Sequence, residues 1–133
     1  MEKYESWIDR AKSSYEYSKA IVNKYVYYED LCYQTQQAVE KALKGLLIYF
    51  GEEPDLTHNI GVLLSSIEKH VEINEEIKEG MDLTNYAVQT RYPGQYTEIT
   101  KNEYKRTVKI AKECIKWVEE VIRNKDKEKN EVK

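Results

Sequence analysis

The stretch YQTQQAVEKALKGLLIYFG, residues 33–51, carries the clearest helical pattern in the chain. Its apolar residues recur every three or four positions, which places them on one face of an α-helix. With the two residues upstream, this apolar face comprises Leu31, Cys32, Thr35, Ala38, Val39, Ala42, Leu43, Leu46, Leu47 and Phe50. Gly51 follows where a left-handed glycine commonly ends a helix. Glu29 and Asp30 precede the face, where acidic side chains favour the positive end of the helix dipole. The sequence therefore predicts a long helix that begins near Glu29 and ends before Gly51.

Four further segments show the same helical period: residues 4–22, 60–71, 75–92 and 101–122. Asn74 is a typical N-cap, and Pro93 disfavours helical backbone at the residue before it. Thr100 and Glu103 match a capping box, which predicts a helix start at Lys101. Short connections make successive helices antiparallel neighbours. The predicted fold class is therefore all-α, an up-and-down antiparallel bundle of about five helices with a four-helix core.

Length and composition favour a single domain. A chain of 133 residues suits one core, and five Gly and two Pro leave few turns. We expect this domain to cover residues 1–124. The remaining segment, KDKEKNEVK at residues 125–133, is polar except for one valine and lacks a helical period, so we expect a disordered charged tail.

Composition also narrows the functional classes. The net charge of -3 does not fit a general DNA-binding body, so any contact with nucleic acid must be local. Cys32 and Cys114 each fall in an apolar helical pattern, which suits buried thiols better than a disulfide. His58 and His70 have no second ligand at metal-binding spacing, so we expect no metal and no cofactor. The longest apolar run, residues 45–50, is far shorter than the ~20 residues of a membrane span. We expect a cytoplasmic protein.

The stretch YAVQTRYPGQY, residues 86–96, places Arg91 where a predicted helix ends. A guanidinium group has a planar fork of donors that suits phosphate, and it stacks on aromatic rings. The predicted ligand-binding site is Arg91 with Tyr86, Tyr92 and Tyr96. The alternative is that Arg91 caps helix carbonyls or pairs with a glutamate while the tyrosines pack.

Five lysines in the last predicted helix fall close to a single stripe: Lys101, Lys105, Lys109, Lys112 and Lys116. Such stripes attract phosphate backbones without sequence preference. The stripe is therefore a candidate anion or RNA surface. The alternative is a solubilising face, because the helix also carries Glu103, Glu113, Glu119 and Glu120.

The long helix has a polar flank formed by Gln37, Lys41 and Lys44. This flank is either a ligand contact or a solvated surface. Glu40 and Lys44 are four residues apart in the order that favours an ordinary surface ion pair.

His58 stands at a predicted helix start, where a structural role that fixes the preceding loop is more common than catalysis. Tyr25, Tyr27 and Tyr28 belong to a chain with twelve Tyr and one Phe. They suit either a dimer surface, since aromatic residues are enriched at interfaces, or a partly wet edge of the bundle.

Three blocks in this order and spacing resemble the HEPN domain: residues 33–51, then His58 with Leu63 and Leu64, then NYAVQTRYP at residues 85–93. The resemblance spans roughly residues 4–122. It implies a helical bundle that often dimerises, found in prokaryotes alone or beside a minimal nucleotidyltransferase partner. It also implies nucleotide or RNA binding.

A large subset of HEPN domains are ribonucleases, often toxins, that carry an arginine, four to six residues and then a histidine. This sequence departs from that motif, because no histidine follows Arg91, and Tyr96 stands where a histidine separated from the arginine by four residues would fall. An ordinary tyrosine, with a pKa near 10, is a poor base at neutral pH. We therefore expect no catalytic residue, and a module that binds nucleotide or RNA phosphate. The resemblance implies that this module acts as a homodimer, with a minimal nucleotidyltransferase partner, or in both ways, in a system of the toxin–antitoxin type. The alternatives are a metal-independent ribonuclease toxin and a purely structural helical interaction protein.

Overall fold

The structure, a computed structural model, describes residues 3–20, 23–53, 57–80 and 99–131. Its helices are α1 (Tyr4–Ser18), α2 (Tyr28–Tyr49), α3 (Ile60–Glu68), α4 (Glu75–Lys78) and α6 (Lys101–Glu131). These ranges contain no β-strand, and the helices pack against one another as a bundle. The all-α prediction is confirmed. No helix within the same ranges has a stretch long and apolar enough to cross a lipid bilayer.

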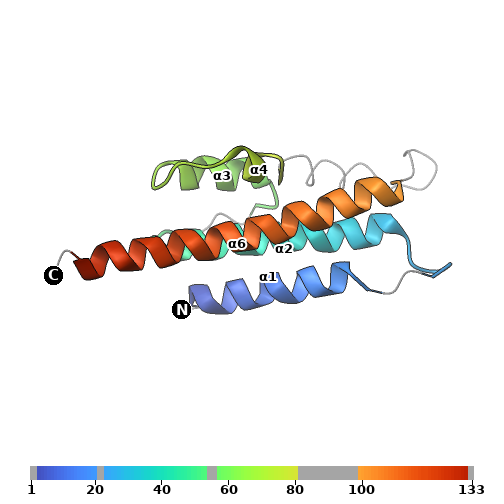
Figure 1. The fold of residues 1–133 in the computed structure, drawn as a ribbon, viewed down its shortest axis with the longest axis horizontal. Helices are drawn as coiled ribbons and strands as arrows, with labels where there is room; N and C mark the ends of the chain where they lie inside the picture. The colour runs from blue at the N-terminus through green and yellow to red at the C-terminus, as the bar shows by residue number, and fades with distance from the viewer. Residues whose placement is uncertain (1–2, 21–22, 54–56, 81–98, 132–133) are drawn as a thin grey trace.

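The helix α2 is the centre of the bundle. It packs against α1, α3 and α6, while α6 also contacts α1 and α4. Figure 1 shows α1 running antiparallel to α2, and α2 and α6 both beginning at the end of the bundle where α1 stops. Residues near the starts of α2 and α6 therefore lie at the same end as the α1–α2 loop.

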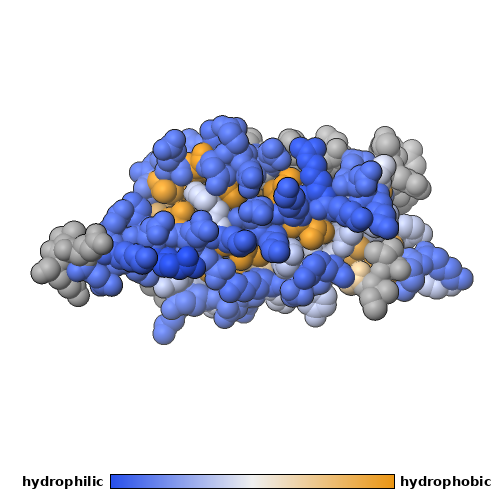
Figure 2. Space-filling view, in the orientation of Figure 1, coloured by the Kyte–Doolittle hydropathy of each residue, from blue (hydrophilic) through white to orange (hydrophobic). Residues whose placement is uncertain are grey.

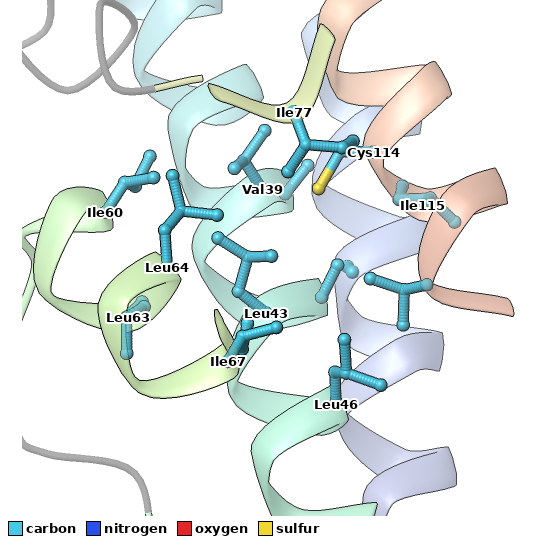
Figure 3. Packing of buried hydrophobic residues seen from close by; sticks show 14 of the residues in the cluster. Val39, Leu43, Leu46, Ile60, Leu63, Leu64, Ile67, Ile77, Cys114 and Ile115 are labelled. Carbon is cyan, nitrogen blue, oxygen red and sulfur yellow. The ribbon is translucent and has the colours of Figure 1, made fainter. Parts of the chain in front are cut away.

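The core is formed by the apolar face predicted for α2. Every residue of that face is buried except Phe50, which is half-buried. Figure 3 shows the side chains that meet at its centre: Val39, Leu43 and Leu46 of α2, Ile60, Leu63, Leu64 and Ile67 of α3, Ile77 of α4, and Cys114 and Ile115 of α6. The three-to-four-residue period of each helix places these side chains on facing sides, so burial of apolar surface holds the four elements together.

Three predicted helix ends are confirmed. Gly51 has a φ of 85°, and the N–H groups of Gly51 and Glu52 donate to carbonyls in the last turn of α2. The Thr100 hydroxyl accepts from the Glu103 N–H at 3.1 Å, and the Glu103 carboxylate accepts from the Thr100 N–H at 3.2 Å. Asn74 accepts from the Ile77 N–H at 2.9 Å and caps α4.

Other boundaries differ from the sequence prediction. The first helix ends at Ser18, whose hydroxyl donates to the Tyr15 carbonyl at 2.5 Å, and Lys19 leaves the helical conformation. The third helix ends at Glu68 and not at residue 71. The fourth is a single turn, because the chain forms a turn at Glu79. Residues 81–92, predicted to continue that helix, lie outside the described residues.

The prediction of a disordered tail over residues 125–133 is wrong for residues 125–131, which continue α6. Local and long-range contacts support this extension. Lys125 pairs with Glu128 one turn ahead at 3.6 Å, and lysine and glutamate are good helix formers. The Tyr49 hydroxyl donates to the Asp126 carboxylate at 2.5 Å, and the Lys129 ammonium lies 4.8 Å from the Tyr49 ring centroid. The end of α2 thus anchors the last turns of α6.

Candidate functional site

One face of α6 carries five exposed lysines, which we call the lysine face: Lys101, Lys105, Lys109, Lys112 and Lys116. At about 100° and 1.5 Å per residue, they fall within about 80° around the helix and extend for about 22 Å. None of the five forms an ion pair with another described residue. Figure 2 shows that hydrophilic side chains dominate the surface in this view, with smaller apolar patches between them. The lysine face is therefore open to solvent and carries unneutralised positive charge.

Two of the four interleaved glutamates interact with residues other than these five lysines. Glu103 accepts from the Thr100 backbone in the capping box. Glu119 pairs with Lys12 of α1 at 3.0 Å. At about 100° per residue, Glu113 falls outside the sector that holds the lysines. Glu120 also falls outside this sector, although it stands one turn beyond Lys116. Since none of the five lysines pairs with a described carboxylate, the lysine face keeps most of its positive charge.

The predicted site at Arg91, Tyr86, Tyr92 and Tyr96 lies outside the described residues. Its role in ligand binding stays a prediction. The sequence places Arg91 ten residues before Lys101, so it precedes the lysine face by a short stretch of chain.

The polar flank of α2 is not an open surface. Glu40 and Lys44 form the ion pair that their spacing predicts, with 3.1 Å between Nζ and Oε2, but only 4% and 9% of their side-chain surfaces are exposed. The expected exposure of this pair was therefore wrong. The Lys44 ammonium lies 5.9 Å from the centroid of the Trp7 ring of α1, which shows why: α1 covers this side of α2. Gln37 and Lys41 are half-buried, and Lys41 donates to the Ser14 hydroxyl at 2.9 Å.

The carboxylate of Glu40 also meets His58 from the loop before α3. The Nδ1 atom of His58 lies 3.0 and 3.1 Å from the two Glu40 oxygens, while 77% of the histidine side chain is exposed. This contact fastens the loop to α2, as a structural role for His58 requires. Sequence reasoning missed Glu40 as its partner. The sequence did contain one signal that Glu40 is buried. The apolar face of α2 is wide, which is typical of a helix packed on several sides.

The described residues offer no obvious place for a metal ion, since no three side chains of His, Cys, Asp or Glu converge among them. Cys32 and Cys114 are free and buried. Burial raises the pKa of Cys114 to about 12, and burial also raises the pKa of Cys32. Both thiols therefore stay protonated and unreactive near neutral pH.

At one end of the bundle, tyrosines join three helices. The rings of Tyr28 and Tyr104 stack with 5.1 Å between centroids, and the Tyr104 hydroxyl donates to the Ser18 carbonyl. Burial raises the pKa of Tyr104. The end of α1 and the starts of α2 and α6 are thereby held together. Other tyrosines at this end are exposed: Tyr17 at 67%, Tyr25 at 77% and Tyr27 at 64%. Tyr28, by contrast, is half-buried against Tyr104, which suits the partly wet edge of the bundle that was the alternative to a dimer surface.

A groove of about 350 Å³ lies between α1 and α6. Its lining residues are Tyr4, Glu5, Ile8, Asp9, Lys12, Glu119, Ile122, Arg123 and Asp126. Four acidic and two basic side chains give this lining a net negative charge, which disfavours phosphate. The lysine face is the better candidate for an anion.

A comparison with protein families matches residues 4–121 to the HEPN domain. The chain belongs to the HEPN family. Two solved structures resemble this HEPN domain. The archaeal HEPN homologue ST0689 has a TM-score of 0.69 and 28% identity, with 92% of this chain and 99% of that chain covered. The protein TT1696 from Thermus thermophilus has a TM-score of 0.77 and 26% identity, with 90% and 98% covered. A comparison with curated proteins found no match.

Both histidines of this HEPN domain contact glutamates. His58 contacts Glu40, and the Nε2 atom of His70 bonds to the carboxylate of Glu52, just after α2. The His70 ring also stacks on Phe50 with 4.5 Å between centroids and 9° between planes. The contact of His58 fastens the segment before α3 to the second half of α2. The contacts of His70 fasten the segment after α3 to the residues that follow α2.

Proposed function

We propose that this HEPN domain binds the phosphate groups of RNA or of a nucleotide through the lysine face together with Arg91. The observation that carries the proposal is the set of five exposed lysines on one face of α6, without ion pairs to other described residues. Lysines arranged in this way displace the counterions of a phosphate backbone, which provides affinity without sequence preference.

Three further points support the proposal. The net charge of the chain is -3, so the lysine face is a local feature and not a sign of a uniformly basic protein. Arg91 offers a bidentate fork that complements the point charges of the lysines. The resemblance to HEPN domains, which are associated with nucleotide and RNA binding, points the same way.

The same resemblance leads us to propose a system of the toxin–antitoxin type. In it the domain forms a homodimer, binds a minimal nucleotidyltransferase partner, or does both. Purification from native cells tests this arrangement. A small nucleotidyltransferase that co-elutes with the domain supports it, whereas a monomer without that partner contradicts it.

RNA binding is tested by fluorescence anisotropy with labelled RNA over a range of salt concentrations. We expect a negative slope of log K against log salt of about 0.7 per phosphate neutralised on single strands. The variant Lys105→Gln/Lys109→Gln/Lys112→Gln lowers the affinity and reduces the slope by about 2, because three contacts are lost.

The matched control, Lys3→Gln/Lys69→Gln/Lys78→Gln, removes the same charge from exposed positions outside α6. We expect it to retain most of the affinity. An equal loss of affinity in both triple variants assigns the effect to net charge and contradicts the lysine face as the site.

Nucleotide binding is tested by calorimetry with ATP on wild type and on Arg91→Ala. If wild type gives no heat of binding, ATP is excluded as the ligand.

A further inference from the structure

The α1–α2 end of the bundle exposes large aromatic surface. More than half of the surface of each of Tyr17, Tyr25 and Tyr27 is open to solvent, and Tyr25, at 77%, is the most exposed of the three. These tyrosines fall within eleven consecutive residues at the end of α1 and in the following loop. An exposed tyrosine offers a flat ring that loses little conformational freedom on binding.

This aromatic end adjoins the start of the lysine face. Tyr104 stands between Lys101 and Lys105 in α6, and its ring stacks on Tyr28, next to Tyr27 in the chain. The hydrogen bond from Tyr104 to Ser18 fixes the end of α1, next to Tyr17, to the same place. Figure 1 shows the α1–α2 loop and the start of α6 at the same end of the bundle.

Positive charge accompanies the exposed rings. The Lys24 ammonium lies 4.9 Å from the centroid of the Tyr25 ring. Lys19 lies 4.6 Å from the centroid of Tyr15 and is paired with Glu16. Because the Lys24 side chain is exposed and forms no ion pair among the described residues, its charge is free to meet a phosphate beside the Tyr25 ring.

Aromatic rings beside a positive track are the combination that binds single-stranded nucleic acid: bases stack on the rings and the backbone follows the cations. Bases within a duplex are already stacked on one another and cannot reach such rings, whereas unpaired bases can. A partner protein needs no continuous positive track of this length, so the charge favours nucleic acid over protein as the occupant of this end.

We propose that Tyr17, Tyr25 and Tyr27 form a stacking platform for unpaired bases, and that the strand continues from this platform along the lysine face. The ligand class is therefore single-stranded RNA, with little dependence on its sequence. This inference rests on the proposed function, because the lysine face supplies the backbone contacts.

The test compares a fluorescein-labelled oligouridine of about 12 nucleotides, within the usual site sizes for single strands, with an RNA duplex of equal length. Tyr25→Ala/Tyr27→Ala lowers affinity for the single strand by about 10-fold for each ring that stacks on a base, and leaves affinity for the duplex unchanged. Tyr25→Phe/Tyr27→Phe keeps the rings and retains wild-type affinity for both. Circular dichroism checks that each variant is folded, as expected for exposed positions.

Three outcomes overturn the platform. If the Ala variant keeps full affinity for the single strand while the lysine triple variant loses it, the platform is wrong and the proposed function stands. If wild type binds neither RNA, RNA binding as the proposed function fails, and the platform fails with it. If sedimentation shows that the Ala variant changes the oligomeric state, the tyrosines belong to an interface between copies.

Discussion

The Nζ atom of Lys44 lies 3.1 Å from the Oε2 atom of Glu40, one turn away on α2, and both side chains are buried. A buried charge is costly unless an opposite charge accompanies it. Glu40 compensates Lys44, and its carboxylate also holds His58. The pair therefore makes the packing of α1 on α2 and the position of the loop before α3 depend on the same carboxylate.

Glu40→Ala is expected to lower the free energy of unfolding by about 3–5 kcal/mol, because it leaves the Lys44 ammonium buried without a partner. Urea unfolding measures the loss. Glu76→Ala, at an exposed position of α4, provides the control and is expected to change stability by less than about 0.5 kcal/mol. Equal effects of the two substitutions contradict the assignment of Glu40 to a buried ion pair.

Gly45→Ala is expected to destabilise the packing of α1 on α2. An added Cβ atom lies 3.0 Å from Ile8 Cδ1, 3.1 Å from Trp7 Cβ and 3.3 Å from the Tyr4 carbonyl oxygen. Alanine favours a helix by up to about 1 kcal/mol, whereas overpacking costs about 1–3 kcal/mol, and neither the backbone oxygen nor the Trp7 Cβ moves easily. Thermal unfolding should show a lower Tm. Ser65→Ala, at an exposed position of α3, is the control that tests helix propensity alone. An equal rise in Tm for both variants contradicts a close contact between position 45 and α1.

Tyr49→Phe is expected to loosen the last turns of α6. The substitution removes the 2.5 Å hydrogen bond to Asp126, whose net contribution is about 0.5–1.5 kcal/mol. Burial and this hydrogen bond raise the pKa of Tyr49, so the hydroxyl remains a donor at neutral and mildly alkaline pH. Hydrogen exchange should become faster in residues 124–131 and stay unchanged in α1. Tyr25→Phe, in the α1–α2 loop, is the matched control, and unchanged exchange in the Tyr49 variant shows that α6 holds its end without this contact.

The buried thiol of Cys114 predicts a fall in stability at alkaline pH. Its folded pKa of about 12 lies above the ordinary value of 9.0, so the unfolded thiol releases its proton first as the pH rises. The protonated thiol therefore contributes to the free energy of unfolding in full below pH 9. This contribution is lost as the pH rises towards 12, with a slope of up to about 1.4 kcal/mol per pH unit.

Comparison with Cys114→Ala isolates this contribution from the other groups that titrate in the same range. The difference in unfolding free energy between wild type and the variant should narrow as the pH rises from 9 to 11, whereas a constant difference refutes the buried thiol. A thiol reagent at pH 8 gives an independent check, since folded wild type should react only as fast as it opens.

The amino-acid sequence by itself determined the features that arise within a few residues of chain. The apolar period of α2, the left-handed Gly51 and the Thr100–Glu103 capping box all depend on neighbours one or two turns away, so residue types and their spacing were sufficient. The single stripe of lysines on α6 follows from the same helical period.

Only the tertiary structure decided which polar residues are buried and how far α6 extends. Glu40 and Lys44 have the spacing of a surface pair, and the packing of α1 over α2 buries them. Residues 125–131 carry no apolar period, yet α6 persists through them, with Asp126 accepting a bond from Tyr49, 77 residues away in the chain. Such contacts depend on which helices lie side by side. The burial of whole apolar faces determines this arrangement, and a pattern of a few neighbouring residues does not encode it.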